Sequence, residues 1–312
     1  MSEAVRRAAA ELRRGRLVAF PTETVYGLGA DASSREAIAR LYEVKGRPGD
    51  HPVIVHFTDA ATAFKWASEV TEAAHKLAAG FWPGPLTLIL KRASTVGDFV
   101  TGGQDTVGLR VPVHPLALEL LAEFGGGLAA PSANRFGRVS PTTAQHVRED
   151  LGDDVDMVLD GGPCGVGIES TIIDLSRGKA VLLRPGGISM AQLESVLGEP
   201  VATPDSAAPR VSGSLAAHYA PRTPARLVAA AGLESEIARQ GAEAAVLAFG
   251  APDARVDFWV RMPRDPVQYA QKLYAALREL DSAGAKVLLI ESPPDTPEWR
   301  AVLDRLRRAA RD

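Results

Sequence analysis

Two hydrophobic patterns alternate along the first two thirds of the chain. Short apolar runs rich in Val, Ile and Leu, typical of strands, alternate with stretches in which apolar residues recur every three to four positions, as in amphipathic helices. Strands are expected at 17–20, 53–57, 86–90, 107–111, 128–130, 156–160, 170–175 and 181–183, and helices at the N-terminus, after Ser33, at 71–81, 115–124 and 142–151, and after Ser189. The alternation predicts an α/β (α+β) domain with a mixed sheet.

The pattern breaks between residues 198 and 224, where small residues and prolines follow one another without an apolar period. It then restarts as β-α-β-α-β-α, with strands at 226–229, 245–249 and 286–290 and helices near 232–240, 267–281 and 297–310. We therefore expect a first domain over 1–197, a linker over 198–224, and a smaller, Rossmann-like α/β domain over 225–312.

Composition limits the classes of protein that fit. The 312 residues are 46% hydrophobic and 23% charged, as in globular proteins, and no apolar run is long enough for a membrane helix. The charged N-terminal helix is unlike a secretory signal, and the single Cys164 excludes a disulfide framework and a Cys-rich zinc site, so we expect a cytoplasmic protein without a dedicated metal site. A net charge of −3 gives no general attraction to nucleic acid.

The stretch LVAFPTETVYGLGAD contains G-x-G-x-x-A, which resembles a dinucleotide-binding loop. That loop should open a helix directly and be followed by an acidic residue about 20 positions later. Here Ser33 and Glu36 form a capping box beyond the glycines, and the next strand ends without a carboxylate. We therefore expect Gly27 and Gly29 to allow a tight turn and close packing instead.

Cations recur at the ends of predicted strands and in the turns after them. Lys45, Arg47 and His51 share one turn, and Arg184 ends a strand. Arg110 shares a strand face with Gly108, which leaves room above the backbone, and an arginine on a half-buried face needs an anionic partner. That partner is either a structural carboxylate or a ligand.

Two turns rich in hydroxyl and amide groups add possible donors to an anion. Ser132 and Asn134 lie in APSAN, and Ser140 and Thr142 lie in VSPT, where either could instead cap the helix over 142–151. Taken together with the basic strand ends, these turns favour an anionic ligand.

Other residues that could suggest chemistry have simpler interpretations. Because no His or Asp motif accompanies Cys164, we expect it to be a turn residue rather than a nucleophile. We expect Phe81 and Trp82 to pack against the protein rather than to stack on nucleic-acid bases.

A chain of motifs then carries a resemblance: PTETVYGLGADA, KGR, HPVIVHF, FWPGPLTLIL, TVGLRVPVHP, APSANRFGRVSPT, LDGGPCGVGIESTIIDL, LLRPGG and HYAP. In this order the chain resembles the YrdC-type threonylcarbamoyl-AMP synthases, in the long form with an additional C-terminal domain. The resemblance implies a YrdC-like twisted mixed sheet over 1–197, an active-site lid formed by the linker 198–224, and a second domain over 225–312.

The resemblance also implies a reaction and its residues. L-threonine, bicarbonate (or CO₂) and ATP would give threonylcarbamoyladenylate and pyrophosphate, which makes the protein a nucleotidyltransferase of tRNA threonylcarbamoyladenosine biosynthesis. A separate tRNA threonylcarbamoyl-transfer complex would receive the product, Mg²⁺ would be bound through the ATP phosphates, and direct tRNA binding stays open. The threonine site implied is Thr24, His56, Arg110, Ala130 and Ser170. The ATP site implied is Lys45, Arg47, His51, Thr106, Ser132, Asn134, Ser140, Arg184 and Tyr219, with Lys45 and Arg47 as catalytic residues.

The chemistry explains these residue types. Arg110 would bind the threonine carboxylate through its planar fork, and the cations would neutralise charge as pyrophosphate leaves. Because carbamates are labile in water, exclusion of solvent should matter more than base catalysis, and the linker with His218 and Tyr219 is a reasonable lid. Two alternatives remain: an RNA-binding module, and a carbamoyl-adenylate step of hydrogenase maturation. The larger proteins of the latter family add an acylphosphatase-like domain and Cys-rich zinc fingers, which this sequence lacks.

Overall fold

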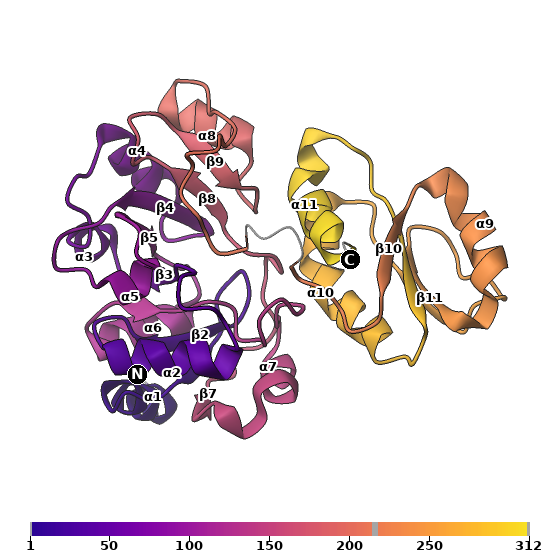
Figure 1. Ribbon diagram of the computed structural model, residues 1–312, viewed down its shortest axis with the longest axis horizontal. Coiled ribbons are helices and arrows are strands. Elements are labelled where there is room, and N and C mark those ends of the chain that lie inside the picture. Colours follow the sequence, from indigo (N-terminus) through magenta and orange to yellow (C-terminus); the bar gives the residue numbers. More distant parts are fainter. Residues whose placement is uncertain (1, 214–217, 311–312) are drawn as a thin grey trace. The chain divides into compact units, whose positions relative to one another are not determined.

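A nine-stranded mixed sheet forms the first of two units in the computed structural model, which describes residues 2–213 and 218–310 (Figure 1). The strands run in the spatial order β7-β1-β2-β6-β3-β5-β4-β8-β9. They are β1 (Val18–Phe20), β2 (Gly27–Asp31), β3 (Ile54–His56), β4 (Leu86–Lys91), β5 (Thr106–Arg110), β6 (Leu128–Ala129), β7 (Met157–Val158), β8 (Thr171–Asp174) and β9 (Val181–Arg184). The predicted mixed α/β fold is confirmed.

Helices cover the two faces of this sheet unequally. They are α1 (Glu3–Arg13), α2 (Arg35–Lys45), α3 (Ala60–Phe64), α4 (Glu72–Phe81), α5 (Asp98–Thr101), α6 (Pro115–Phe124), α7 (Ala144–Leu151) and α8 (Met190–Leu197), with a short η1 (Gly152–Asp154). Apolar residues of α2, α4, α7 and α8 join the main core on one face, whereas α1 and α6 pack on the other face beside β1. The remaining part of that second face carries the candidate site.

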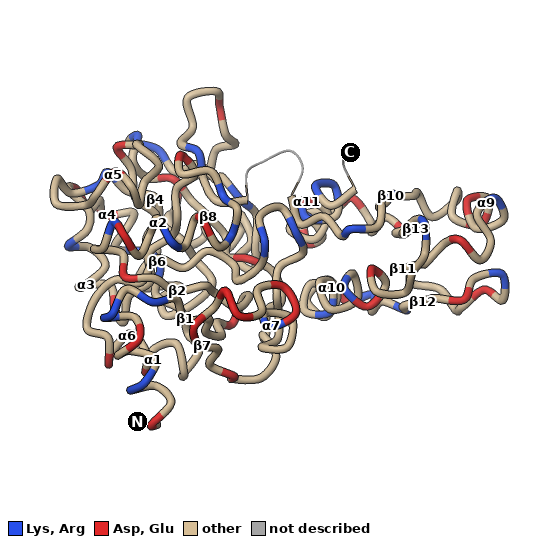
Figure 2. The backbone as a smooth tube through the Cα atoms, turned by 60° about the horizontal axis from the view of Figure 1, so that its bottom comes forward, with Lys and Arg blue, Asp and Glu red and all other residues tan. Residues whose placement is uncertain are grey.

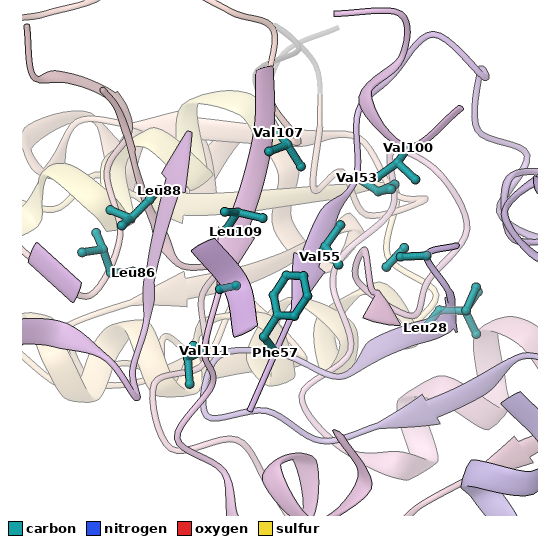
Figure 3. Packing of buried hydrophobic residues seen from close by; sticks show 14 of the residues in the cluster. Leu28, Val53, Val55, Phe57, Leu86, Leu88, Val100, Val107, Leu109 and Val111 are labelled. Carbon is teal, nitrogen blue, oxygen red and sulfur yellow. The ribbon is translucent and has the colours of Figure 1, made fainter. Parts of the chain in front are cut away.

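Side-chain alternation along the central strands explains this division. Val55, Leu88, Val107 and Leu109 point into the main core (Figure 3). The residues between them therefore face the opposite side of the sheet. There only a small cluster of buried apolar residues, Ile89, Ile172 and Val211, is found in the described part of the chain.

The second unit is an independent, fully parallel sheet in the order β10-β13-β11-β12 (Figure 1). Its elements are β10 (Ala225–Val228), α9 (Ala230–Gln240), η2 (Gly241–Glu243), β11 (Ala244–Ala248), β12 (Phe258–Arg261), α10 (Pro266–Asp281), β13 (Val287–Glu291), η3 (Pro297–Trp299) and α11 (Arg300–Ala309). The unit comprises Leu215–Asp312 together with Gly137–Ser140 and Val166–Ile168. Residues 214–217 of the predicted linker lie outside the described residues. The predicted Rossmann-like pattern is confirmed, with β12 as an additional strand.

Two predictions about LVAFPTETVYGLGAD and the following helix are corrected. Gly27–Asp31 is a strand, antiparallel to β1, and not a tight turn. The close packing is real, because a Cβ on Gly29 would lie 2.9 Å from a ring carbon of Phe20. Helix α2 is capped by Ser34, whose side chain accepts from the amide of Ala37, and not by Ser33.

Other helix predictions agree more closely. The helix expected at 115–124 has these bounds, and α8 begins with the predicted capping box of Ser189 and Gln192. Helix α7 is capped by Thr143, so neither Ser140 nor Thr142 has this role. Within residues 2–213 and 218–310, no helix has the length and apolar character needed to span a membrane.

Candidate active site

Two parallel strand ends place His56 and Arg110 side by side. His56 ends β3, Arg110 ends β5, and the parallel register pairs the two residues directly. Both are more than nine-tenths buried. Burial, together with the nearby charge of Arg110, lowers the pKa of His56 to about 3. His56 is therefore a neutral imidazole at physiological pH.

Arg110 is held by a buried carboxylate that the sequence analysis did not name. Its Nη2 donates to Oε1 of Glu23 at 2.6 Å, with side-chain exposures of 5% and 10%, and its Nε donates to the carbonyl of Gly84 at 3.4 Å. The other oxygen of Glu23 accepts from the amide of Val113 at 3.2 Å. The structural carboxylate considered above is therefore present, in the middle of the PTET motif.

Thr24 and Ala130 border the same face. Thr24 is fully buried in the loop between β1 and β2, and its Oγ1 lies 2.8 Å from Oγ1 of Thr22. Ala130 directly follows β6, and its amide donates to the carbonyl of Ile54 in β3 at 3.0 Å. The end of β6 therefore adjoins the strand that carries His56, and the β1–β2 loop reaches Arg110 at the end of β5 through Glu23.

Ser170 joins the edge of this face to a second cation. Arg184 donates through Nε to the carbonyl of Ser170 at 3.0 Å and through Nη2 to its hydroxyl at 3.1 Å. The same hydroxyl lies 2.8 Å from Oγ1 of Thr87 on β4. Ser170, predicted for threonine, and Arg184, predicted for ATP, are thus in direct contact.

Lys45 is inserted into the turn that follows β6. It is the last residue of α2, and its Nζ donates to the carbonyls of Ser132 at 2.5 Å and Asn134 at 2.6 Å. Burial lowers the pKa of Lys45 well below its usual value, and Arg47 adds to this effect. The structure therefore brings the KGR and SAN motifs together. An anionic ligand bound there would stabilise the charged form of Lys45.

Arg47 and His51 lie beside the ring of Phe136. The guanidinium of Arg47 lies 5.9 Å from the ring centroid, and the imidazole of His51 meets the ring at 5.3 Å. Arg47 also donates to the carbonyl of Pro52 at 2.7 Å and to Oγ of Ser212 at 3.1 Å. Burial and the charge of Arg47 lower the pKa of His51.

Ser212, from the predicted linker, bridges two of the predicted ATP-binding arginines. Its hydroxyl accepts from Arg47, and its carbonyl accepts from Nη1 of Arg184 at 2.8 Å. Its hydroxyl also donates to the carbonyl of Pro52 at 2.9 Å. Two guanidinium groups expected to hold phosphates are therefore bound to one linker residue.

Strand β5 spans the candidate site from end to end. Thr106 begins it and Arg110 ends it, so these two residues share a face and lie about 13 Å apart at about 3.3 Å per residue. The space expected above Gly108 is filled, since a Cβ there would lie 3.2 Å from Ile89 and 3.4 Å from Ile54. The apolar pair separates the two ends of the face.

Ser140 and Tyr219 belong to the second unit, which we describe by itself. Ser140 is fully buried, and its carbonyl accepts from Nε of Arg278 at 3.5 Å. Tyr219 is also buried, has a positive φ of 61°, and packs near the ring of Tyr274 and the guanidinium of Arg305. Both are thus ordered parts of that unit.

The cations and hydroxyl groups gathered on this face are suited to an anionic ligand. No group of three or more His, Cys, Asp or Glu residues able to hold a metal ion occurs in the described residues. Cys164 is buried, and burial raises the pKa of its thiol to about 12, so it is not a thiolate nucleophile. Phe81 and Trp82 pack against the core, as expected.

Three residues of this site were missed by sequence reasoning: Glu23, Thr87 and Ser212. Glu23 had a usable signal, because a carboxylate directly after a buried strand can pair with the arginine of another strand end. Thr87 and Ser212 had none, since a threonine in an apolar strand and a serine among linker residues are unremarkable before folding.

Comparisons with known proteins agree with the motifs. A Sua5, YciO and YrdC family model, described as telomere recombination, matches residues 10–186, and one described as threonylcarbamoyl-AMP synthase, C-terminal domain, matches residues 188–311. The chain is similar to threonylcarbamoyl-AMP synthase of Pyrococcus abyssi (40% identity, 98% of this chain, 94% of the relative) and to that of Bacillus subtilis (39%, 98% and 92%). Its structure is similar to P. abyssi Sua5 complexed with L-threonine, with a TM-score of 0.92 at 38% identity over 98% of this chain and 94% of that one. The matches extend over both units.

Proposed function

Because the chain belongs to the threonylcarbamoyl-AMP synthase family, we propose that it joins L-threonine, bicarbonate or CO₂, and ATP into threonylcarbamoyl-AMP and pyrophosphate. It is thus a nucleotidyltransferase that carries out the first step of tRNA threonylcarbamoyladenosine modification. The product passes to a tRNA threonylcarbamoyl-transfer complex, and we expect the reaction in the cytoplasm. Residues 1–197 form the catalytic domain, 198–224 its lid, and 225–312 the additional domain.

One observation carries this proposal. Arg184 donates to both the carbonyl and the hydroxyl of Ser170, so a cation suited to phosphate touches a hydroxyl suited to an amino acid. The reaction requires such proximity, because the new bond joins an oxygen of the carbamoylated amino acid to the α-phosphorus of ATP.

The threonine end of the site is assigned to the face shared by His56 and Arg110. The guanidinium of Arg110 binds the carboxylate, while Glu23 fixes its orientation from the other side. Neutral His56, Thr24 and Ser170 orient the amine and the side-chain hydroxyl. A pocket with hydrogen-bonding groups for a hydroxyl discriminates against amino acids that lack one.

The ATP end is assigned to the cations around the SAN turn. Lys45, Arg47 and Arg184 neutralise the triphosphate, which enters as its Mg²⁺ complex and so supplies the ion together with the substrate. The remaining proposed ATP contacts are His51, Thr106, Ser132, Asn134, Ser140 and Tyr219.

Bond changes follow from this placement. The threonine amine loses a proton and bonds the carbon of CO₂ to give a carbamate. A carbamate oxygen then bonds the α-phosphorus as the bond from this phosphorus to the pyrophosphate oxygen breaks. The residues hold the partners in line and exclude water, because both the carbamate and its mixed anhydride are labile in water.

Ser212 supports the assignment of the linker as a lid. It uses donors of Arg47 and Arg184 that the phosphates would also need. ATP and this linker residue therefore compete for the same guanidinium groups, and the linker has to leave them when the nucleotide enters.

The test is pyrophosphate release from ATP with threonine and bicarbonate each omitted in turn, with mass spectrometry to identify the adenylate. Release should require both. Release that continues without threonine or without bicarbonate would contradict the assignment. We do not favour an RNA-binding module. Such modules concentrate basic residues, whereas both acidic and basic residues occur along the backbone of both units (Figure 2).

A further inference from the structure

The carboxyl edge of the parallel sheet in the second unit carries a pocket of about 790 Å³. Phe249 directly follows β11, Arg261 ends β12, and Arg264 lies in the turn that follows. Gln268, Gln271 and Lys272 complete the lining from the first turns of α10, at positions that share one helix face. Open parallel α/β sheets bind their ligands at this edge, and the volume is in the usual range for small-molecule sites.

The three cations of this pocket lack a carboxylate partner. In the part of the chain that the structure describes, no Asp or Glu oxygen forms an ion pair with Arg261, Arg264 or Lys272, and all three are exposed. Other basic residues of the same unit are paired, among them Arg239 with Glu236 and Lys286 with Glu243. The pocket therefore concentrates positive charge that the protein itself does not neutralise.

Two acidic residues that adjoin residues of the pocket are bound to backbone amides. Glu291, at the end of β13, accepts from the amide of Phe249 at 2.7 Å. Asp265 caps α10 by accepting from the amide of Gln268 at 2.8 Å. Both carboxylates are thus bound to backbone amides rather than to the guanidinium groups.

The positions of these cations are fixed by neighbouring groups. Arg264 lies over the ring of Phe249, with its guanidinium 5.4 Å from the centroid. Phe249 is buried and makes edge-to-face or tilted contacts with Tyr269 and Trp299, at 5.6 and 5.7 Å. Lys272 donates to the carbonyl of Arg261 at 2.8 Å, which links the second turn of α10 to the end of β12.

We propose that this pocket binds a phosphate-bearing small molecule. Two guanidinium groups and an ammonium group at one sheet edge match the charge and the acceptors of a phosphate or pyrophosphate group. The amides of Gln268 and Gln271 provide further donors and acceptors for the rest of the ligand. The residues that line this pocket all belong to the second unit, and none of them is among the contacts proposed for threonine or ATP.

The test counts binding sites on the full-length protein by calorimetry and equilibrium dialysis, with inorganic phosphate, pyrophosphate and AMP as separate probes. The wild type should bind two equivalents of at least one probe, with the second Kd at about 1 mM or tighter. The Arg261→Ala/Arg264→Ala variant should bind one equivalent and retain pyrophosphate release. The matched control, Arg239→Ala/Lys286→Ala, removes the same number of cations from the same unit and should retain two.

Three outcomes would overturn the proposal: one equivalent of every probe in the wild type, loss of the second equivalent in the control as well, or retention of both equivalents in the pocket variant. A tRNA affinity that the pocket variant loses, without a second equivalent of any small probe, would also overturn it and assign the pocket to RNA. Lys272→Gln provides a second variant, which should weaken the same equivalent if the pocket is the site. Because pyrophosphate release is measured on every variant, failure of this proposal is distinguishable from failure of the assigned reaction.

Discussion

Arg110 and Glu23 form a buried ion pair, 2.6 Å between Nη2 and Oε1, that links the end of β5 to the loop after β1. Neither charge can be removed without leaving the other uncompensated in a buried environment. We expect Arg110→Met and Glu23→Leu each to lower the free energy of unfolding by about 3–5 kcal/mol, and the double variant to lose less than the sum. Urea unfolding of the wild type, the two single variants and the double variant measures the coupling energy between the two side chains. Strictly additive losses would contradict the prediction.

The second prediction concerns the side of the Arg110 guanidinium that faces away from Glu23 and is assigned to the threonine carboxylate. Arg110→Lys keeps the charge but loses the planar fork, so threonine binding should weaken about tenfold or more while ATP binding changes little. Calorimetric titration with each substrate separates the two effects. Equal losses for threonine and ATP would mean that Arg110 serves the fold alone, and Arg177→Lys, outside the site, is the matched control.

The third prediction follows from the depressed pKa of His56, about 3 in the folded protein against about 6.5 when unfolded. Between these values the unfolded chain binds the additional proton, so this contribution to stability is complete above about pH 6.5 and is lost as the pH falls towards 3. It amounts to a few kcal/mol, because one pKa unit corresponds to about 1.4 kcal/mol.

His56→Gln should therefore flatten the loss of stability between about pH 6.5 and 4. Urea unfolding at several pH values compares it with the wild type, and His75→Gln, at an exposed helix position, is the control. A wild-type slope that survives in His56→Gln would show that other groups cause the acid sensitivity.

The fourth prediction concerns the buried ammonium of Lys45. Lys45→Met should lower kcat/KM for ATP by about two to three orders of magnitude, because it removes a fixed cation from the phosphate end of the site. Lys45→Arg should not restore activity, since its larger head does not fit between the carbonyls of Ser132 and Asn134. Threonine binding is the internal control, and unchanged pyrophosphate release in Lys45→Met would exclude the assigned role.

The fifth prediction uses Cys164. Its thiol is buried, and its pKa is raised to about 12, so alkylation at neutral pH should require unfolding of the first unit. Cys164→Ser should retain adenylate synthesis. Rapid labelling of the native protein would show that the turn opens, and loss of activity in Cys164→Ser would assign the thiol a role that its environment does not suggest.

Local sequence signals predicted most of the elements correctly. The apolar spacing of α6, the proline at its first position and the glycine after it define this helix within the sequence itself. Strand β2 was missed because its GLGAD sequence has low strand propensity, and its pairing with β1 and packing under Phe20 provide the stabilisation instead. Strand β12 was missed for a different reason: its FWVR sequence has high strand propensity, but at the edge of the sheet only Val260 is buried, so no alternation of apolar and polar residues marks it.

The sequence by itself determined the alternating fold, the family motifs and the cationic character of the strand ends, because these depend on residue type and short-range spacing. Only the tertiary structure decided which of these residues meet. Arg110 binds Glu23, 87 positions away, Arg184 binds Ser170, and Ser212 reaches both Arg47 and Arg184. Such contacts depend on strand order and register, which bring distant segments together and leave no local trace in the sequence.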